Sequence, residues 1–225
     1  MASISVVIPC YNEEASIGEV IRAVPKGVLE VLIIDNNSTD RTAEIAAQNG
    51  ARVVVERQQG YGPALACGFR NALGDILVTL DGDNQYPPYT VVDIANCLDE
   101  NNLDFISASR YPLMDRGSMP LLRKVGNWGL TIATNVLFNL RLHDAQSGMW
   151  IFRKKTLDLL PLQETKVNKG MSLTQEIKVR AAKHPNIRFA EYHIPYHPRM
   201  GHSKLNPFRD GWRMLMFLLK LRIRG

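Results

Sequence analysis

The stretch "LVTLDGDNQYPP" (Leu77–Pro88) decides the fold class of this chain. It opens on an apolar, β-branched run that is typical of a buried strand. The two closing prolines cannot continue a strand and favour the start of a helix. Asp81, Asp83 and Gln85 therefore follow directly after a buried strand. In open α/β sheets ligands bind at this edge, and a solvated Asp-Gly turn is the alternative interpretation.

The first half of the chain alternates apolar runs with helical patterns. We expect strands at Ile4–Pro9, Val28–Asp35, Arg52–Glu56, Leu77–Asp81 and Phe105–Ser109, and helices at Glu13–Val24, Asp40–Asn49, Gly62–Ala72 and Tyr89–Glu100. This alternation predicts an α/β fold with a mostly parallel sheet flanked by helices. The 225 residues are enough for one good-sized domain.

The second half is less regular. We expect helices at Met119–Leu140, Met171–Ala182 and Phe208–Leu221, and strands at Met149–Phe152 and Ile187–Ile194. The last helix is apolar on nearly every side and must bury two faces, one with Trp212 and Leu219 and the other with Leu218 and Leu221. One face can meet the domain and the other a membrane or partner, whereas burial in the protein's own core or in a homodimer is the alternative.

Composition and charge narrow the classes of function. No apolar run reaches the roughly 20 residues of a membrane span, and we expect no signal peptide at the N-terminus. The three cysteines form no metal pattern and indicate a reducing compartment, with burial as small apolar side chains. Of the net charge of +5, the surplus lies after residue 198, which points to phosphates or an anionic membrane there. Duplex nucleic acid fits this charge less well, because no recognisable binding motif accompanies it, and we expect no nucleic-acid partner.

Six motifs in a fixed order support a family resemblance. "VVIPCYNEE" (6–14), "IIDNNSTDRT" (33–42) and "LDGDNQYPP" (80–88) together resemble the family 2 glycosyltransferases of the GT-A fold. "SRY" (109–111), "DAQSGMWIFRK" (144–154) and "PRMGHSKL" (198–205) look like the dolichol-phosphate mannosyltransferase branch. That branch moves a sugar from a nucleotide sugar to a polyprenyl phosphate, and the resemblance spans essentially the whole chain.

The resemblance implies a metal site in the loop Asp81–Gln85, here called the acidic loop. The diphosphate leaving group of a nucleotide sugar needs a divalent cation to neutralise it. Mg²⁺ and Mn²⁺ prefer oxygen ligands. In the family branch the corresponding two aspartates and glutamine bind the metal, and Asp81, Asp83 and Gln85 are all present here. The cofactor that we expect is therefore Mg²⁺ or Mn²⁺.

The resemblance also implies a nucleotide-sugar pocket. The residues that it assigns to this pocket are Pro9, Tyr11, Glu13, Asp35, Gly60, Asp81, Gly82, Asp83 and Asp144. Asp144 is the expected contact to a hydroxyl of the donor sugar. The family usually has Asp-Asp-Gly-Ser after the second strand, whereas this chain has Asp35-Asn36-Asn37-Ser38. One carboxylate is absent, so the residue that contacts the base stays open, and the two asparagines are alternatively turn residues.

The acceptor side departs from the common family pattern. A hydroxyl acceptor needs a carboxylate base, often in a Glu-Asp motif, but the comparable helix here carries Gln175-Glu176. A phosphate acceptor needs no base, because its second pKa is about 6. It needs cations, and the matched motifs offer Arg110, Arg123, Arg199 and Lys204. Their alternative interpretation is a solvated basic surface. We expect Asp83, Arg110 and Arg199 to be the catalytic residues.

These implications define one expected function. It is a metal-dependent, inverting transfer of a hexose from a UDP- or GDP-sugar to a polyprenyl phosphate, dolichyl or undecaprenyl. One GT-A domain (1–225) would divide into a nucleotide-sugar half (1–110) and an acceptor and membrane-facing half (111–225). We expect cytoplasmic, peripheral attachment through Met119–Leu140 and Phe208–Arg224, or a membrane-tethering partner. The alternatives are a family 2 transferase for a soluble glycan or other hydroxyl acceptor, with Glu176 as base, and a non-catalytic nucleotide-sugar binder.

Overall fold

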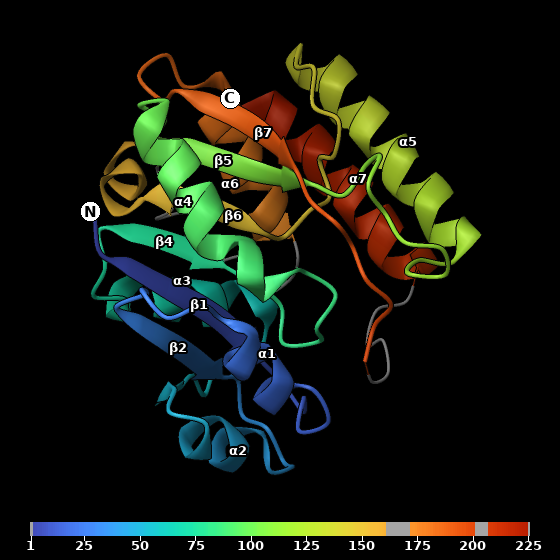
Figure 1. Cartoon of the computed structure of the whole chain (residues 1–225). Helices are drawn as coiled ribbons and strands as arrows, with labels where there is room; N and C mark the ends of the chain where they lie inside the picture. The colour runs from blue at the N-terminus through green and yellow to red at the C-terminus, as the bar shows by residue number, and fades with distance from the viewer. Residues whose placement is uncertain (1, 161–171, 201–206, 225) are drawn as a thin grey trace.

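The computed structural model describes residues 2–160, 172–200 and 207–224 (Figure 1). The strands are β1 (Ile4–Cys10), β2 (Glu30–Asp35), β3 (Arg52–Val55), β4 (Ile76–Thr79), β5 (Phe105–Ser109), β6 (Trp150–Arg153) and β7 (Phe189–His193). The α-helices are α1 (Ile17–Ala23), α2 (Thr42–Gln48), α3 (Tyr61–Asn71), α4 (Val91–Glu100), α5 (Leu121–Phe138), α6 (Ser172–Lys183) and α7 (Pro207–Arg224). Two short 3-10 helices, η1 (Pro88–Thr90) and η2 (Lys154–Leu159), complete the described elements.

The strands form a single sheet in the order β3-β2-β1-β4-β6-β5-β7. Every described pairing is parallel except those of β6, which runs antiparallel to both β4 and β5. The predicted mostly parallel α/β sheet is therefore confirmed. Because β6 is reversed, the residues that precede it lie at the same edge as the carboxyl ends of its neighbours: Thr79 at the end of β4 pairs with Trp150 at the start of β6.

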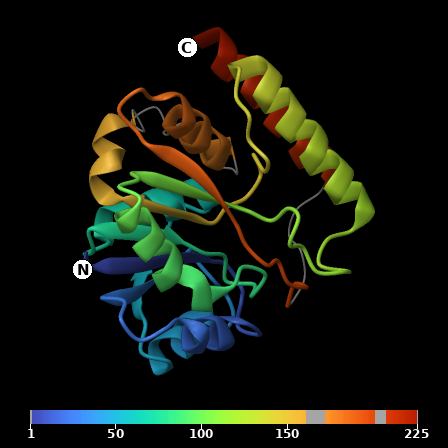
Figure 2. The ribbon, with the colours of Figure 1, turned by 45° about the horizontal axis from the view of Figure 1, so that its top comes forward.

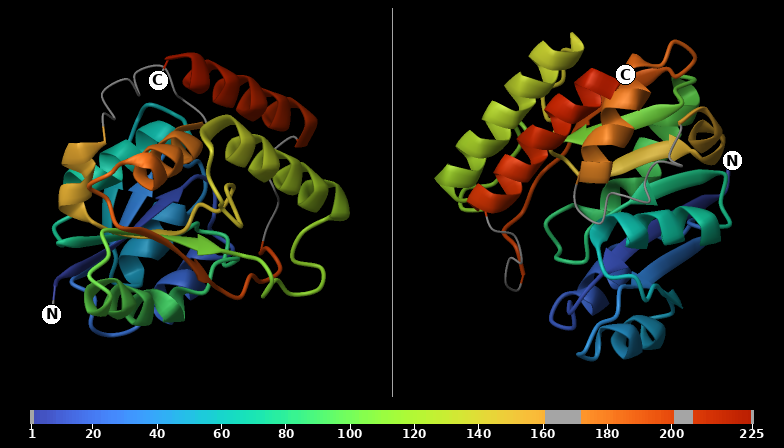
Figure 3. Two further views of the ribbon diagram at one scale, coloured as in Figure 1. Left: turned by 90° about the horizontal axis from the view of Figure 1, so that it is seen from above. Right: turned by 180° about the vertical axis from the view of Figure 1, so that it is seen from behind.

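Helices cover both faces of the sheet, which explains why β1 is buried at every position. Side chains of α1, α2 and α4 pack with Val6 and Ile8 on one face, and those of α3 and α6 pack with Val7 on the other. Figure 3 (left) shows α4 and α6 on opposite sides of the strands. The approach of α3 to β1 requires glycine, since a Cβ on Gly68 would lie 2.3 Å from a Val7 methyl carbon.

Helices α5 and α7 lie side by side, away from the sheet (Figures 2 and 3). Leu218 and Leu221 of α7 pack with Phe138 of α5, whereas Trp212 is 64% exposed. One of the two predicted apolar faces of α7 therefore packs on the domain, and burial of the other face stays a prediction. Helix α5 carries an apolar stripe that is exposed along its length, at Leu122, Val125, Trp128, Ile132 and Val136. Within the described residues, none of the helices has both the length and the apolar character to cross a bilayer.

The predicted boundaries need small corrections. The first helix begins at Ile17 instead of Glu13, because residues 13–16 form a turn in which the Glu13 carbonyl accepts from the Ser16 and Ile17 amides. The helix expected from Tyr89 begins as η1 and continues as α4. The three cysteines form no disulfide among the described residues, and Cys10 and Cys67 are buried, which confirms the apolar interpretation for these two.

Candidate active site

The carboxyl edge of the sheet brings the predicted residues together. β1 leads into Tyr11 and Glu13, β2 ends at Asp35, β4 leads into Asp81, and β5 leads into Arg110. The reversed β6 brings the "DAQSG" segment, with Asp144, to the same edge. Residues far apart in the sequence thus meet where ligands bind in open α/β folds.

The acidic loop holds two carboxylates close together. The Tyr61 hydroxyl donates to Asp81 Oδ1 at 2.9 Å, and the Gln85 amide donates to Asp83 Oδ1 at 3.0 Å. Asp83 is 3% exposed. Burial, and then the charge of Asp83, raise the pKa of the Asp81 carboxyl to about 7. Two carboxylates that repel each other in this way provide a favourable place for a cation.

The segment His197–Met200 packs against the acidic loop. The His197 amide donates to the Gln85 carbonyl at 2.9 Å, and the Met200 amide donates to the Asp83 carbonyl at 3.0 Å. Between them, Arg199 Nη2 lies 3.1 Å from Asp83 Oδ2 and 3.6 Å from Glu13 Oε1. Three predicted site residues (Glu13, Asp83 and Arg199) therefore form one charged cluster.

Gln85 is oriented by its own hydrogen bonds. Its side-chain Nε2 donates to the carbonyls of Ser118, at 3.0 Å, and His197, at 3.2 Å. These two bonds use the amide nitrogen and leave the oxygen Oε1 for another partner. The described residues contain no preformed cluster of three His, Cys, Asp or Glu side chains for a metal. Two carboxylates and an amide oxygen nevertheless match the donor set of Mg²⁺ or Mn²⁺, whose remaining positions phosphate oxygens commonly fill.

Asn36 explains the departure from the family pattern after β2. Its Nδ2 donates to the carbonyls of Glu56 and Gln58, both at 2.9 Å, and its Oδ1 accepts from the Gly60 amide at 2.7 Å. An aspartate cannot donate to those carbonyls, so the amide serves to anchor the segment that leads into α3. Asn37 has a left-handed φ of 64°, as a turn residue. Asp35 remains the carboxylate of the motif, and its Oδ1 accepts from the Ser38 amide at 3.3 Å.

Arg110 and Asp144 are each other's main partners. Arg110 Nε and Nη2 donate to the two Asp144 oxygens at 2.7 and 2.9 Å, and both side chains are buried. Burial alone would raise the pKa of Asp144, but the Arg110 guanidinium outweighs it and lowers that pKa to about 2. The guanidinium also lies 5.2 Å from the centre of the Tyr196 ring. The expected contacts of Asp144 with a sugar and of Arg110 with a phosphate remain predictions, and both would have to form while the two side chains stay paired.

The other predicted acceptor residues are more dispersed. Arg123 lies in the first turn of α5, and Lys204 falls outside the described residues. Glu176 is buried, and its Oε1 accepts from Arg180 Nε at 2.9 Å, one turn further along α6. The carboxylate proposed as a base in the alternative reaction is therefore occupied by an ion pair.

Sequence reasoning missed Lys178 and Tyr86. Lys178 Nζ donates to the carbonyls of Asp144, at 2.8 Å, and Ser147, at 2.9 Å. Tyr86 Oη accepts from the Gly148 amide at 2.7 Å. Both fix the "DAQSG" segment. The available signal for Lys178 was its place between Thr174 and Ala181, at helical spacing on the buried face of α6.

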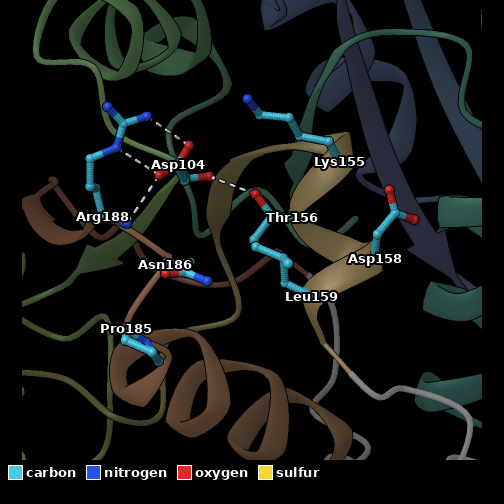
Figure 4. A pocket seen from close by; sticks show the side chains of 8 residues that line it. All are labelled: Asp104, Lys155, Thr156, Asp158, Leu159, Pro185, Asn186 and Arg188. Carbon is cyan, nitrogen blue, oxygen red and sulfur yellow. Dashed lines mark hydrogen bonds and ion pairs between the residues drawn. The ribbon is translucent and has the colours of Figure 1, made fainter.

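A cavity of about 590 Å³ lies elsewhere (Figure 4). Asp104 and Arg188, which pair across it, directly precede β5 and β7, at the edge opposite the acidic loop. Lys155 and Asp158 of η2 also line it. The cavity is therefore separate from the candidate active site.

Known proteins are similar to this chain in sequence or in fold. The low-salt glycan biosynthesis hexosyltransferase Agl6 of Haloferax volcanii is 35% identical over 96% of this chain and 53% of its own length. The dolichyl-phosphate hexose transferase of the same organism is 33% identical over 92% of this chain and 89% of its own. This chain thus spans about half the length of the first relative. Glucosyl-3-phosphoglycerate synthase of Mycobacterium tuberculosis, in complex with UDP, has a TM-score of 0.75 at 22% identity, over 98% of this chain and 80% of that one.

The chain belongs to glycosyl transferase family 2, whose pattern matches residues 5–160. It is therefore a glycosyltransferase, and relatives named for dolichyl-phosphate hexose transfer confirm the resemblance stated above. The structural neighbour confirms the GT-A fold, and at this identity it shows the fold alone. The same synthase has also been crystallised with Mn²⁺, UDP and phosphoglyceric acid.

Proposed function

We propose that this glycosyltransferase moves a hexose, with inversion, from a UDP- or GDP-sugar to a polyprenyl phosphate. The observation that carries the proposal is the cluster of Asp81, Asp83 and Gln85 at the carboxyl edge of the sheet. Arg199 forms an ion pair with Asp83 of this cluster. A relative that this chain matches over 89% of its length is named dolichyl-phosphate hexose transferase, and that name supports the choice of acceptor.

Each group of site residues would have its own role in the sugar transfer. Asp81, Asp83 and the Gln85 oxygen would hold Mg²⁺ or Mn²⁺, which would neutralise the diphosphate leaving group. Asp35, Tyr11 and the segment anchored by Asn36 would receive the nucleoside. Arg199 and Arg110, with Arg123 and Lys204, would orient the acceptor phosphate. One phosphate oxygen attacks the anomeric carbon as the bond to the diphosphate breaks, and no proton has to be removed, because the nucleophile is already anionic.

The exposed apolar surface of α5 and α7 supports peripheral membrane attachment. Trp128 of α5 is 66% exposed, and Trp212 and Ile223 of α7 are 64% and 86% exposed. Basic residues accompany them at Arg209, Arg213, Lys220 and Arg222. Apolar side chains flanked by cations suit the surface of an anionic bilayer, and we expect the cytoplasmic face, whose leaflet carries the anionic lipids. Vesicle flotation tests this: the protein should float with anionic vesicles and less so at high salt, and absence of binding would contradict it.

Calorimetric titration with UDP and with GDP, each with and without Mn²⁺, tests the donor site. One nucleotide should bind tightly, and the binding should be lost without metal and in Asp83→Ala. The matched control is Asp93→Ala, on the outer face of α4. Binding of neither nucleotide would contradict the proposal.

A further inference from the structure

Lys178 on α6 is a buried charge to which the proposed chemistry assigns no task. Its side chain is 1% exposed and ranks among the largest fully buried side chains of the described residues. Its two hydrogen bonds go to the Asp144 and Ser147 carbonyls, at 2.8 and 2.9 Å. Neither acceptor is a carboxylate, so backbone solvates the ammonium, and no carboxylate among the described residues forms a direct ion pair with it.

Two carboxylates lie near this ammonium, and each has other hydrogen-bond partners. Asp144 is held in a two-pronged pair by Arg110. Glu191, the next carboxylate, accepts from the His143 ring at 2.9 Å and from the His143 and Asp144 amides. The group Arg110, Asp144 and Lys178 therefore contains two cations and one anion. Burial lowers the pKa of Lys178 to about 8; the Arg110 charge adds to this lowering, and Asp144 and Glu191 oppose it.

Such an arrangement is costly unless the charge is used. An ammonium that leaves water without an ion pair loses hydration that backbone carbonyls only partly replace. An apolar side chain of similar length would fill the same space without that loss. An arginine paired with an aspartate, by contrast, presents almost no net field to a ligand. A second buried cation restores one positive charge to the pair, in surroundings of low dielectric constant where its field is weakly screened.

We propose that Lys178 is a positioning residue for the transfer. Its ammonium fixes the turn from Asp144 to Ser147 and keeps the Arg110–Asp144 pair net positive toward the acceptor phosphate. Asp144 can then hold the Arg110 guanidinium in place without cancelling the attraction for the ligand. This inference rests on the proposed function, because it assigns the acceptor phosphate to the Arg110 side of the site.

Steady-state kinetics of Lys178→Met tests the proposal, with Lys183→Met, an exposed lysine on the same helix, as the control. In Lys178→Met the KM for polyprenyl phosphate should rise roughly tenfold, while the KM for the donor should change less than about twofold. A residue that only supports the fold would alter both KM values and kcat together. An unchanged acceptor KM would overturn the proposal.

The pH profile separates charge from packing. The wild-type acceptor KM should rise above about pH 8, where the Lys178 ammonium loses its proton. The groups that face it are Asp144, Arg110 and Glu191; the pKa of Asp144 is lowered to about 2 and that of Arg110 is raised, so these two keep their charge there. Lys178→Met should lack the rise, and Lys178→Arg should keep the low KM to higher pH. The same rise in Lys178→Met as in the wild type would contradict the inference.

Hydrogen exchange distinguishes failure of the positioning role of Lys178 from failure of the proposed function. If wild-type protein transfers no sugar to polyprenyl phosphate, the proposed function is wrong and the positioning claim is judged by amide exchange alone. The Gln146 amide, bonded to Asp144 Oδ1, and the Gly148 amide, bonded to Tyr86 Oη, should then exchange faster in Lys178→Met than in Lys183→Met. Equal exchange in the two variants would overturn the positioning role as well.

Discussion

Arg199 bridges two acidic side chains of the candidate active site, with its Nη2 lying 3.1 Å from Asp83 Oδ2 and 3.6 Å from Glu13 Oε1. Asp83 follows β4 and Glu13 follows β1, so the ion pair ties the segment after β7 to the loops of two central strands. The Met200 amide adds a bond to the Asp83 carbonyl. Arg199 is thus already at the carboxylate that is proposed to hold the metal.

Replacement of Arg199 should impair turnover more than it impairs folding. In Arg199→Met we expect kcat/KM to fall roughly 10²-fold, because a cation aimed at the reacting phosphates is lost. The melting temperature should stay within a few degrees of the wild-type value. Arg41→Met, which breaks an exposed pair with Glu44, is the control and should keep full activity. Wild-type kinetics in Arg199→Met would refute the role of this side chain.

Metal removal should abolish donor binding. A chelator should weaken nucleotide binding at least roughly tenfold, and Mn²⁺ or Mg²⁺ should restore it, because Asp81 and Asp83 repel an unneutralised diphosphate. Asp83→Asn should behave like the chelated protein and Asp93→Asn like the wild type. Tight nucleotide binding in the presence of chelator would show that the acidic loop holds no metal in the reaction.

Asn36→Asp should destabilise the protein even though it restores the second aspartate of the common family pattern. The two donated bonds to the Glu56 and Gln58 carbonyls are lost, and a buried carboxylate then faces carbonyl oxygens. We expect the free energy of unfolding to fall by about 1–3 kcal/mol in urea titrations. Asn37→Asp, at the neighbouring exposed turn position, is the matched control and should change little. Equal stability of the two variants would mean that Asn36 does not anchor this segment.

Asp144 should make stability depend on acid pH. Its pKa in the folded state is about 2, below the usual value of 3.8, so its contribution is complete above about pH 4 and lost as the pH falls toward 2. The contribution amounts to about 2 kcal/mol. Asp144→Asn should be less stable at neutral pH by about 3–5 kcal/mol, since Arg110 loses its buried partner, and its unfolding free energy should fall less steeply in acid. Parallel acid titrations of variant and wild type would contradict this account.

Lys178 should make stability depend on alkaline pH, with the same direction of change. Its pKa of about 8 in the folded state lies below the usual 10.5, so the unfolded chain binds more protons between these values. Wild-type stability relative to Lys178→Met should therefore rise as the pH increases from about 8 to 10, by at most ~3 kcal/mol. Guanidinium titrations of the two proteins across that range measure the difference. A constant difference would mean that Lys178 is not buried as a cation at neutral pH.

The sequence predicts the order of the elements well, because local patterns determine them. Apolar runs that end in "DNNS" and "DGDNQ" identify the carboxyl edge of the sheet, and the apolar character of α7 predicts its two faces. The antiparallel direction of β6 could not be predicted, because the sequence "WIFR" is typical of any buried strand. A buried strand of this kind carries no mark of its direction.

The motifs of the candidate site could be predicted from the sequence, whereas the interactions between its side chains could not. Arg110 and Asp144 lie 34 residues apart, and only the fold brings them together. Lys178 escaped notice because a lysine is ordinarily exposed. The role of Asn36 depends on carbonyls that no local pattern places beside it.

The most direct test of the central claim is transfer of labelled hexose. Wild-type protein is incubated with UDP-hexose or GDP-hexose, polyprenyl phosphate and Mn²⁺, and the label is followed into the organic phase. The account predicts that the label from one donor class enters the lipid, that the product is labile to mild acid, and that transfer is lost with chelator or in Asp83→Ala. Label that passes instead to a soluble acceptor, with no lipid product from either donor, would contradict it.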